Sequence, residues 1–389
     1  MSLDRAGLGA KPQDVLQSHA MINFKRLFVY VGAYTHAASA GQVRAEGIYV
    51  YRLDAITGIL TPVSVAKDII NPSFLACDPR KRFLYAVNEV AELDGQDGGA
   101  VSAFAIDPVS GALIPLNRQC TLGADPCYLS VDASGKWLLA ANYGSGSMTI
   151  LPIQEDGWLG AVTAVVPHHG ASVDPERQAG PHAHCIIPDL ANRHVLAADL
   201  GADKIMLYRF DATSGELSPH DPPWVAVRPG AGPRHLAFHP SGRYLYSTNE
   251  LDSTVTTWAY DTARGILREI QTLSTLPQDF AGVNYPAHVQ VAPSGKFLYV
   301  SNRGHDSLAV FAIDQEGRGL VAAGHVPTQG QWPRHFAIDP AGAWLLAANQ
   351  RSNSIITFRM DAEKGLPTDM AESTTTPAPV CVQMIELEN

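Results

Sequence analysis

Short apolar runs separated by turn residues recur along the whole chain, and each series of runs starts at a proline. An alternating run follows the proline, then a turn such as Pro240–Arg243, then a second apolar run that ends in asparagine sixteen residues after the proline. A third run follows, and the series closes with Asp-x-x-x-Gly-x-Leu, as in Asp107–Leu113, before a last short run. The runs are rich in β-branched and aromatic residues and are bounded by Gly, Pro, Asn and Asp, so each predicts a β-strand.

The series occurs seven times, with a period of 46–55 residues and four predicted strands in each unit. Repeats of this length with four strands are typical of the blades of a β-propeller. No segment has a long 3.6-residue period, so no long helix is expected. The predicted fold is all-β, a seven-bladed β-propeller with four-stranded blades. The units start at Pro72, Pro126, Pro181, Pro233, Pro286, Pro333 and Pro379.

The seventh unit is split between the two ends of the chain. The N-terminal part supplies apolar runs at 27–32, 47–54 and 58–66, and the C-terminal part supplies the missing first strand at 379–384. Pairing of these ends in one blade closes the ring and removes open sheet edges. We therefore expect one propeller domain over residues 24–389, preceded by a flexible lead-in over residues 1–23 that lacks the apolar core of a signal peptide.

Composition narrows the possible partners and location. The net charge of −10 argues against a surface for nucleic acid or anionic membranes. The five cysteines are odd in number and widely spaced without a C-x-x-C pair, which argues against a zinc or disulfide framework and fits a reducing compartment. No apolar run approaches the ~18 residues of a membrane span. We expect a cytoplasmic protein with neither nucleic-acid nor membrane partners; nothing in the sequence indicates its oligomeric state.

Blade geometry predicts which side chains meet at one mouth of the central channel. The first strand of a blade starts at one rim and the second, antiparallel strand ends there, so the residues after each proline and after each asparagine belong to that rim. In the third unit Asp199 takes the place of the asparagine. Structural positions in a repeat recur, whereas these positions vary, which favours a specialised site over a solvated rim of mixed charge. The predicted rim residues are Ser73, Cys127, His182, Arg234, Ala287, Arg334 and Val380, then Glu89, Tyr143, Leu200, Glu250, Arg303 and Gln350, with Tyr34 in the split blade.

Long insertions at 167–180, 278–285 and 91–99 lead to the same rim, and long loops on a rigid scaffold often carry function. The pair His182 and His184 would suit a metal, but no further ligands stand at clear spacing, so we expect neither metal nor cofactor.

The other histidines carry weaker signals. A packed or hydrogen-bonded His184 is the favoured alternative to a metal ligand. The loop pair His168 and His169 is expected to be solvated. His235, His288 and His335 recur at one repeat position, which predicts a structural role.

Four segments resemble motifs of the seven-bladed lactonases, a family that includes propeller-type 6-phosphogluconolactonases and carboxymuconate cycloisomerases. They are Asp174–Gln178 with Gly180–His184, Gly232–His235, Asn249–Leu251 and Ser301–Arg303. The resemblance implies a catalytic set of His182, Arg234, Glu250 and Arg303, with Arg334 as the alternative to Arg303. Further residues near the mouth are expected to bind substrate: Arg177, Arg334, Glu89, Tyr143, Gln350 and His184.

These residue types suit hydrolysis of a lactone, which needs a general base to activate water and cationic groups to stabilise the tetrahedral oxyanion. Glu250 or His182 could be the base, and the arginines could hold the oxyanion and an anionic substituent of the substrate. The resemblance implies a small-molecule anionic lactone as substrate, either 6-phosphogluconolactone or an unphosphorylated aldonic or aldaric lactone. The alternatives are a cycloisomerase acting on a muconate and a propeller that binds without catalysis.

Overall fold

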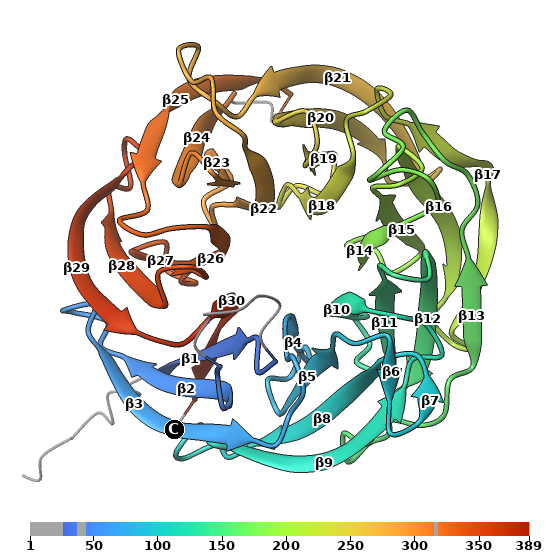
Figure 1. The fold of residues 1–389 in the computed structure, drawn as a ribbon, viewed down its shortest axis with the longest axis horizontal. Coiled ribbons are helices and arrows are strands. Elements are labelled where there is room, and N and C mark those ends of the chain that lie inside the picture. The colour runs from blue at the N-terminus through green and yellow to red at the C-terminus, as the bar shows by residue number, and fades with distance from the viewer. Residues whose placement is uncertain (1–25, 37–43, 315–317, 389) are drawn as a thin grey trace, which may run out of the picture.

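A computed structural model of the protein describes residues 26–36, 44–314 and 318–388. Seven four-stranded antiparallel sheets stand around a central channel, as the sequence predicts (Figure 1). The described residues form strands and turns and no helix, so no helix among them could cross a membrane. The predicted lead-in, residues 1–23, lies outside the described residues, and so does the predicted start of the domain at residue 24.

Six blades are each built from one continuous stretch of chain, with the first strand innermost, and the β6–β7 hairpin stands apart from the sheets. Their strands are β4 (Leu75–Cys77), β5 (Phe83–Asn88), β8 (Ala100–Ile106) and β9 (Leu113–Cys120); β10 (Pro126–Val131), β11 (Trp137–Asn142), β12 (Ser147–Pro152) and β13 (Ala164–Pro167); β14 (Ala183–Pro188), β15 (His194–Asp199), β16 (Lys204–Asp211) and β17 (Glu216–Ala226); β18 (Pro233–Phe238), β19 (Tyr244–Asn249), β20 (Thr254–Asp261) and β21 (Ile266–Ser274); β22 (Tyr285–Val291), β23 (Phe297–Arg303), β24 (Ser307–Ile313) and β25 (Leu320–Pro327); β26 (Pro333–Ile338), β27 (Trp344–Asn349), β28 (Ser354–Met360) and β29 (Pro367–Thr375); and, in the hairpin, β6 (Glu92–Leu93) and β7 (Gln96–Asp97).

The seventh blade joins the two ends of the chain. Its order is β3 (Leu60–Lys67), β2 (Gly47–Leu53), β1 (Arg26–Ala33) and β30 (Pro379–Leu387). The C-terminal strand is the innermost one and pairs antiparallel with β1, from Arg26 opposite Leu387 to Ala33 opposite Pro379. Figure 1 shows this closure, with β30 beside β1. The predicted splitting of one blade between the termini is therefore confirmed.

Buried side chains of the repeat hold each blade in register. In the turn after β4, the buried Asp78 accepts hydrogen bonds from the backbone N–H groups of Arg82 and Phe83 (2.6 and 2.7 Å). At the end of β11, Asn142 Nδ2 donates to Thr149 Oγ1 (2.9 Å), and Asn249 donates to the next strand of its own blade in the same way. These asparagines have a structural role, and each holds the residue that follows it at the channel mouth.

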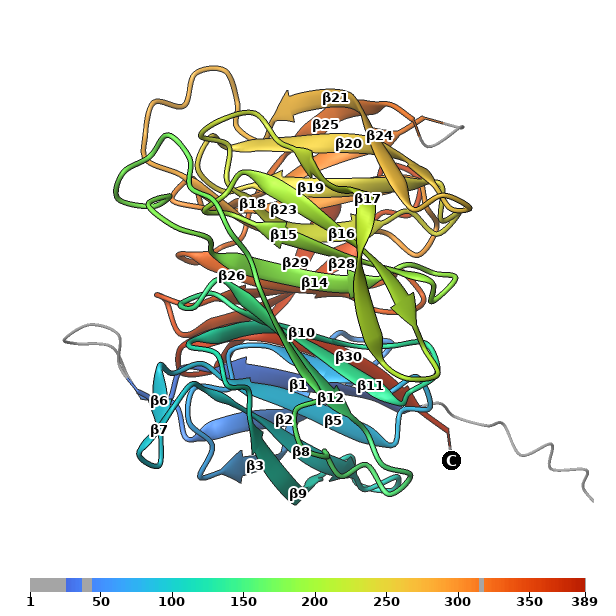
Figure 2. The same cartoon turned by 90° about the vertical axis from the view of Figure 1, so that its right-hand side faces the viewer.

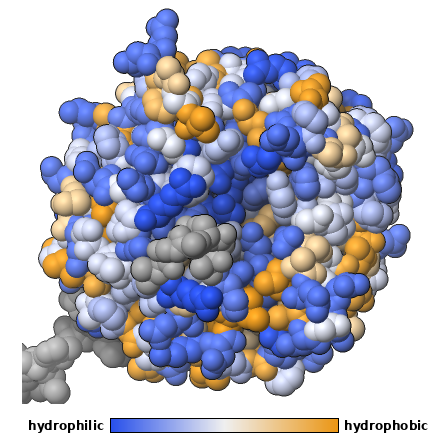
Figure 3. Space-filling model, viewed as in Figure 1, coloured by the Kyte–Doolittle hydropathy of each residue, from blue (hydrophilic) through white to orange (hydrophobic). Residues whose placement is uncertain are grey.

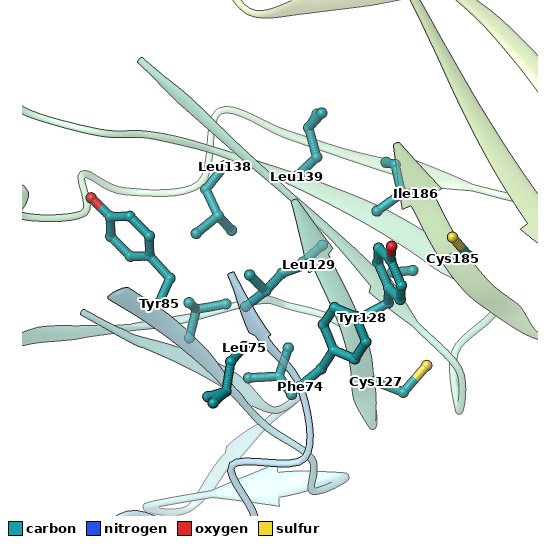
Figure 4. Close-up of a cluster of buried hydrophobic side chains, with 14 of the residues drawn as sticks. Phe74, Leu75, Tyr85, Cys127, Tyr128, Leu129, Leu138, Leu139, Cys185 and Ile186 are labelled. Atoms are coloured by element: carbon teal, nitrogen blue, oxygen red, sulfur yellow. The ribbon is translucent and has the colours of Figure 1, made fainter. Parts of the chain in front are cut away.

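The long insertions project from one side of the ring, together with the β6–β7 hairpin (Figure 2). Viewed onto that side, the molecule is hollowed at its centre, and hydrophilic residues gather around the hollow (Figure 3). The largest core cluster lies between and within the blades on the β4 to β18 side of the ring; Figure 4 shows part of it, with Leu75, Tyr85 and Leu129 packed together. Rigid blades therefore surround one polar depression.

Candidate functional site

The depression at the channel mouth is a pocket of about 390 Å³. A larger cavity of about 640 Å³ lies at the opposite end of the channel, but no arginine, lysine, aspartate or glutamate lines it. We therefore place the candidate active site at the mouth, because the pocket there, unlike the cavity at the opposite end of the channel, gathers charged groups able to stabilise a reacting anion. Its lining residues are Glu89, Cys127, Tyr143, Arg177, His184, Glu250, Tyr285, Arg303, Trp332, Arg334 and Arg351.

Glu250, which follows β19, is the buried carboxylate of this pocket and has three arginine neighbours. Its Oε1 lies 2.7 Å from Arg177 Nη2, and its Oε2 lies 2.7 Å from Arg303 Nη2 and 2.9 Å from Arg234 Nε. Burial by itself would raise the pKa of Glu250, but the three guanidinium groups outweigh burial and hold this pKa far below its usual range. Glu250 is therefore a carboxylate throughout the physiological pH range.

Arg234 lies beneath the pocket and is 2 % exposed. Its Nη1 donates to the backbone oxygen of Ala287 (2.8 Å) and to His235 Nε2 (3.0 Å), so His235 accepts at Nε2 and carries its proton on Nδ1. That proton is donated to His288 Nδ1 at 3.0 Å. The Arg234 Nε–H is not directed at Glu250 and makes no hydrogen bond to the described residues, so the Arg234–Glu250 contact is ionic. Arg234 is thus a fixed positive charge under the carboxylate.

The buried histidines of the channel stay neutral. Burial, followed by the charge of Arg234, lowers the pKa of His184 and of His235 well below the usual range, and burial lowers that of His288 likewise. His335 joins them by stacking on His288, with 3.8 Å between ring centres. Neutral imidazoles can donate and accept along a chain of rings, and here they fill the channel below the arginines.

Arg303 and Arg177 reach Glu250 from the wall of the pocket. Arg303, the last residue of β23, also donates from Nε to the backbone oxygen of Tyr285 (3.0 Å). Arg177 comes from the insertion before β14 and is about one third exposed (34 %), with its guanidinium carbon 5.9 Å from the centre of the Tyr285 ring. Both guanidinium groups face the cavity, where they could bind a developing oxyanion.

The predicted histidines occupy different positions at the pocket. His184 lines it, whereas His182 is not among the lining residues. The ring of His182 stacks on Tyr143, with 4.4 Å between ring centres, and its Nδ1 donates to the Tyr143 backbone oxygen (2.9 Å), which leaves Nε2 free to accept a proton. His182 therefore supports the Tyr143 wall, and it is the motif's second histidine that faces the cavity.

One sequence expectation is wrong. His168, expected to be a solvated loop residue, is 3 % exposed, and its Nδ1 lies 2.6 Å from Asp199 Oδ2. Asp199 Oδ1 accepts the backbone N–H of His182 at 2.9 Å. The insertion before β14 folds back onto the ring, so that His168 and Asp199 together hold the start of β14.

The remaining predicted residues lie near the pocket in different ways. Glu89 lines it and accepts hydrogen bonds from Tyr34 (3.0 Å) and Ser73. Arg334 lines the pocket, with its guanidinium carbon 5.6 Å from the centre of the Tyr34 ring. Gln350 is buried and does not line it. Among the described residues no group of three or more His, Cys, Asp or Glu side chains could hold a metal ion.

Three lining residues were not singled out from the sequence: Tyr285, Trp332 and Arg351. Tyr285 and Trp332 each stand directly before the proline of a unit, and Arg351 stands two residues after the asparagine. The rim was predicted only from the residue after each proline and the residue after each asparagine. Adding the residue before each proline and the second residue after each asparagine would have found all three.

Comparison with known proteins gives a consistent result. Residues 28–384 match the model of a protein family described as "Lactonase, 7-bladed beta-propeller". The chain is 38 % identical over 357 residues to a 6-phosphogluconolactonase of Bacillus subtilis, covering 92 % of this chain and 97 % of that one. It is 34 % identical over 306 residues to a 6-phosphogluconolactonase of Formosa agariphila, covering 78 % and 84 %.

A solved structure has the same architecture. The periplasmic gluconolactonase of Pseudomonas aeruginosa superposes with a TM-score of 0.86 at 34 % sequence identity, covering 93 % of this chain and 99 % of that one. The similarity spans the whole ring, so the pocket at the channel mouth lies on a scaffold shared with these proteins.

Proposed function

This chain belongs to the seven-bladed β-propeller lactonase family, and from this premise we propose that it hydrolyses an anionic sugar-acid lactone in the pocket at the channel mouth. Its similarity to 6-phosphogluconolactonases within that family makes it a lactone hydrolase; the substrate and the residue roles that follow are the proposal. The observation that supports them best is the buried Glu250, surrounded by Arg177, Arg234 and Arg303 on the cavity floor.

In the proposed reaction Glu250 is the general base. A water molecule attacks the lactone carbonyl carbon while Glu250 takes its proton, and the carbonyl electrons move to the oxygen. Arg303 and Arg177 stabilise that oxyanion, and Arg234 remains a fixed charge below. When the oxyanion collapses, the ring C–O bond breaks and the leaving oxygen receives the proton from Glu250, which gives the open-chain acid.

The arginines link the stabilisation of the oxyanion to the basicity of Glu250. Paired with three guanidinium groups, Glu250 is ionised but only weakly basic. As negative charge develops on the substrate oxygen, Arg303 and Arg177 interact with that oxygen, so Glu250 loses part of their stabilisation and becomes a stronger base. The carboxylate therefore gains proton affinity at the moment when the water loses its proton.

A panel of lactones tests the function. Purified protein is given 6-phosphogluconolactone, gluconolactone, an aldaric lactone and a carboxymuconate, and acid release is followed by pH-stat titration. We expect proton release from at least one sugar lactone well above its spontaneous hydrolysis. Turnover of the muconate without uptake of water would identify a cycloisomerase, and no turnover of any compound would favour a binding protein; either result contradicts the proposal.

The pH dependence tests the assignment of the base. The pKa of Glu250 is held far below its usual range, so the carboxylate does not titrate between about pH 7 and about pH 5. We therefore expect kcat/KM to stay constant over this pH range. An imidazole base of ordinary pKa would instead lose activity around pH 6.5, whereas His184, whose pKa is lowered by burial, would not titrate there. Initial rates corrected for spontaneous hydrolysis at each pH provide the measurement, and a midpoint near that value would assign the base to a histidine.

A further inference from the structure

One junction between neighbouring blades departs from the repeat. In four blades the residue that follows the outer strand is a fully buried threonine: Thr121, Thr275, Thr328 and Thr376. After β13 this residue is His168. Its backbone N–H donates to the Gly146 carbonyl oxygen (2.9 Å), as the N–H of Thr275 does to the Ser253 carbonyl oxygen (2.9 Å), so the two positions are equivalent. The histidine therefore stands where the fold elsewhere uses a threonine.

The partner of this residue changes as well. At the junction between β21 and β22, Thr275 Oγ1 donates to Asn302 Oδ1 (2.9 Å), and Asn302 Nδ2 donates to the Thr275 carbonyl oxygen (2.7 Å). At the junction between β13 and β14, Asp199 occupies the asparagine position, and His168 Nδ1 lies 2.6 Å from its Oδ2. A neutral Thr–Asn pair is thus replaced at this junction by an ionisable His–Asp pair.

The His168–Asp199 pair is unfavourable for folding in two respects. Both side chains are fully buried, and His168 Nε2 has no hydrogen-bond partner among the described residues. Burying ionisable groups and leaving a buried polar atom unpaired both oppose folding. The threonine and asparagine at the equivalent junction show that two blades can be joined without ionisable groups. A pair that the fold could replace in this way points to a role beyond joining the blades.

Asp199 ties down both ends of the insertion before β14. Its Oδ2 accepts a hydrogen bond from His168, at the start of the insertion, and its Oδ1 accepts the backbone N–H of His182 (2.9 Å), just past the end of the insertion. Between these ends, the buried Gln178 donates from Nε2 to the carbonyl oxygen of Leu200 (2.9 Å), the residue after Asp199. The insertion is therefore held at three points on the end of β15.

Arg177 depends on this anchoring more than the other arginines around Glu250 do. Arg234 and Arg303 belong to β18 and β23, whereas Arg177 lies in the insertion, directly before Gln178. It reaches Glu250 across a blade boundary, with its Nη2 2.7 Å from Oε1. A long side chain on a loop loses conformational entropy when it makes such a contact, so the contact persists only where the loop itself is already fixed.

We propose that His168 and Asp199 are positioning residues for Arg177: their buried pair clamps the insertion to the ring and so keeps the Arg177 guanidinium on Glu250 in the pocket. Neither His168 nor Asp199 lines the pocket, so the pair acts on the reaction through Arg177. This inference rests on the proposed lactone hydrolysis, in which Arg177 stabilises the oxyanion, and it adds the two residues that hold Arg177 in place.

Restoring the pair that the repeat uses elsewhere tests the proposal. The double variant His168→Thr/Asp199→Asn has the residues of the junction at Thr275 and Asn302, so we expect it to fold, which circular dichroism would check. Its kcat/KM on the lactone that the wild type hydrolyses best should fall about tenfold, because Arg177 is no longer held in place. His168→Asn is the matched control: its amide N–H takes the place of the imidazole Nδ1–H, so its activity should stay close to that of the wild type.

A double-mutant cycle with Arg177→Ala separates positioning from a general structural effect. If the pair acts through Arg177, the double substitution should lower kcat/KM about tenfold in the wild-type background and cause no further loss in the Arg177→Ala background. A merely structural role would give the same loss in both backgrounds. That result, or no loss in either background, overturns the proposal.

Hydrogen exchange measured by mass spectrometry examines the clamp without requiring turnover. Within the insertion the Ser172 N–H donates to the Gln178 carbonyl oxygen (2.9 Å), and the Gln178 N–H donates to that of Asp174 (2.8 Å). We expect peptides from residues 170–180 to exchange about tenfold faster in the double variant than in the wild type or in His168→Asn, because these bonds open more often when the insertion is released. Peptides from residues 278–284, another insertion at the same mouth, are the internal reference and should be unchanged.

The exchange experiment also separates failure of this proposal from failure of the proposed function. Unchanged exchange at residues 170–180 in the double variant overturns the clamp, whether or not a lactone is hydrolysed. Faster exchange together with no turnover of any lactone by the wild type would support the clamp and overturn only the proposed function.

Discussion

Replacing Glu250 with glutamine should reduce kcat/KM for lactone hydrolysis by about a thousandfold, since removal of a general base commonly costs 10²- to 10⁴-fold. Glutamine keeps the size and shape of the side chain, but it cannot take a proton and no longer carries the charge around which Arg177, Arg234 and Arg303 are arranged. Steady-state rates on the lactone that the wild type hydrolyses best provide the measurement. A loss smaller than tenfold would remove Glu250 from the chemistry.

The same substitution should weaken the fold. It leaves Arg234 buried without its counterion, and breaking a buried ion pair by changing one partner costs on the order of 3 kcal/mol. The folded pKa of Glu250 lies below the value of about 4.3 expected in the unfolded chain, so the ion pairs stabilise the protein above that pH and this contribution is lost on acidification. The difference in unfolding free energy between wild type and variant should therefore narrow as the pH falls below about 4.

The same substitution at a glutamate outside the pocket is the matched control for the losses of activity and stability expected in Glu250→Gln. Glu372 on β29 accepts a hydrogen bond from the backbone N–H of Leu60 (2.6 Å) far from the pocket. Glu372→Gln should keep full activity and lose little stability. If both variants lost activity to the same degree, the loss at Glu250 would reflect general destabilisation.

Replacing Arg303 with lysine should lower kcat about a hundredfold, because removal of a group that stabilises an oxyanion costs 10²- to 10³-fold. Lysine keeps the charge but cannot contact Glu250 and the Tyr285 carbonyl at once, as Arg303 does through Nη2 and Nε. Arg334, which does not contact Glu250, is the paired comparison: Arg334→Lys should raise KM for a phosphorylated lactone and change kcat little.

These two variants decide which residue is the second arginine of the catalytic set. The sequence left Arg303 and Arg334 as alternatives, and their contacts divide the roles between chemistry and binding. A kcat loss in Arg334→Lys with normal kcat in Arg303→Lys would reverse the assignment. Circular dichroism and melting temperatures would show whether both variants are folded.

The fold was predictable because its information is local. The spacing from each proline to its asparagine, and the alternation between them, depend only on residues in one blade, and the structure confirms seven four-stranded sheets. Closure followed from counting strands, since the N-terminal part lacked one strand and residues 379–384 supplied it. The correct placement of Glu250 and Arg303 at one mouth followed from the same count.

The site was only partly predictable, because its contacts cross between blades. Arg177 and Glu250 are 73 residues apart, and Arg303 and Glu250 are 53 apart. Repeat position showed that these residues share a rim, but not which side chains point into the cavity and which pack behind it. His182 stacks on Tyr143 and does not line the pocket, so its catalytic role stays a prediction, whereas His168 was expected in solvent and pairs with Asp199.

The sequence by itself therefore determined the number of blades, the closure of the ring and most of the residues at its mouth, because strand period and turn chemistry act over a few neighbouring residues. Only the tertiary structure decided how the arginines divide, with Arg177, Arg234 and Arg303 in contact with Glu250 while Arg334 and Arg351 lie over aromatic rings without contacting it. That division depends on distances between side chains from different blades, which are set once the ring has closed.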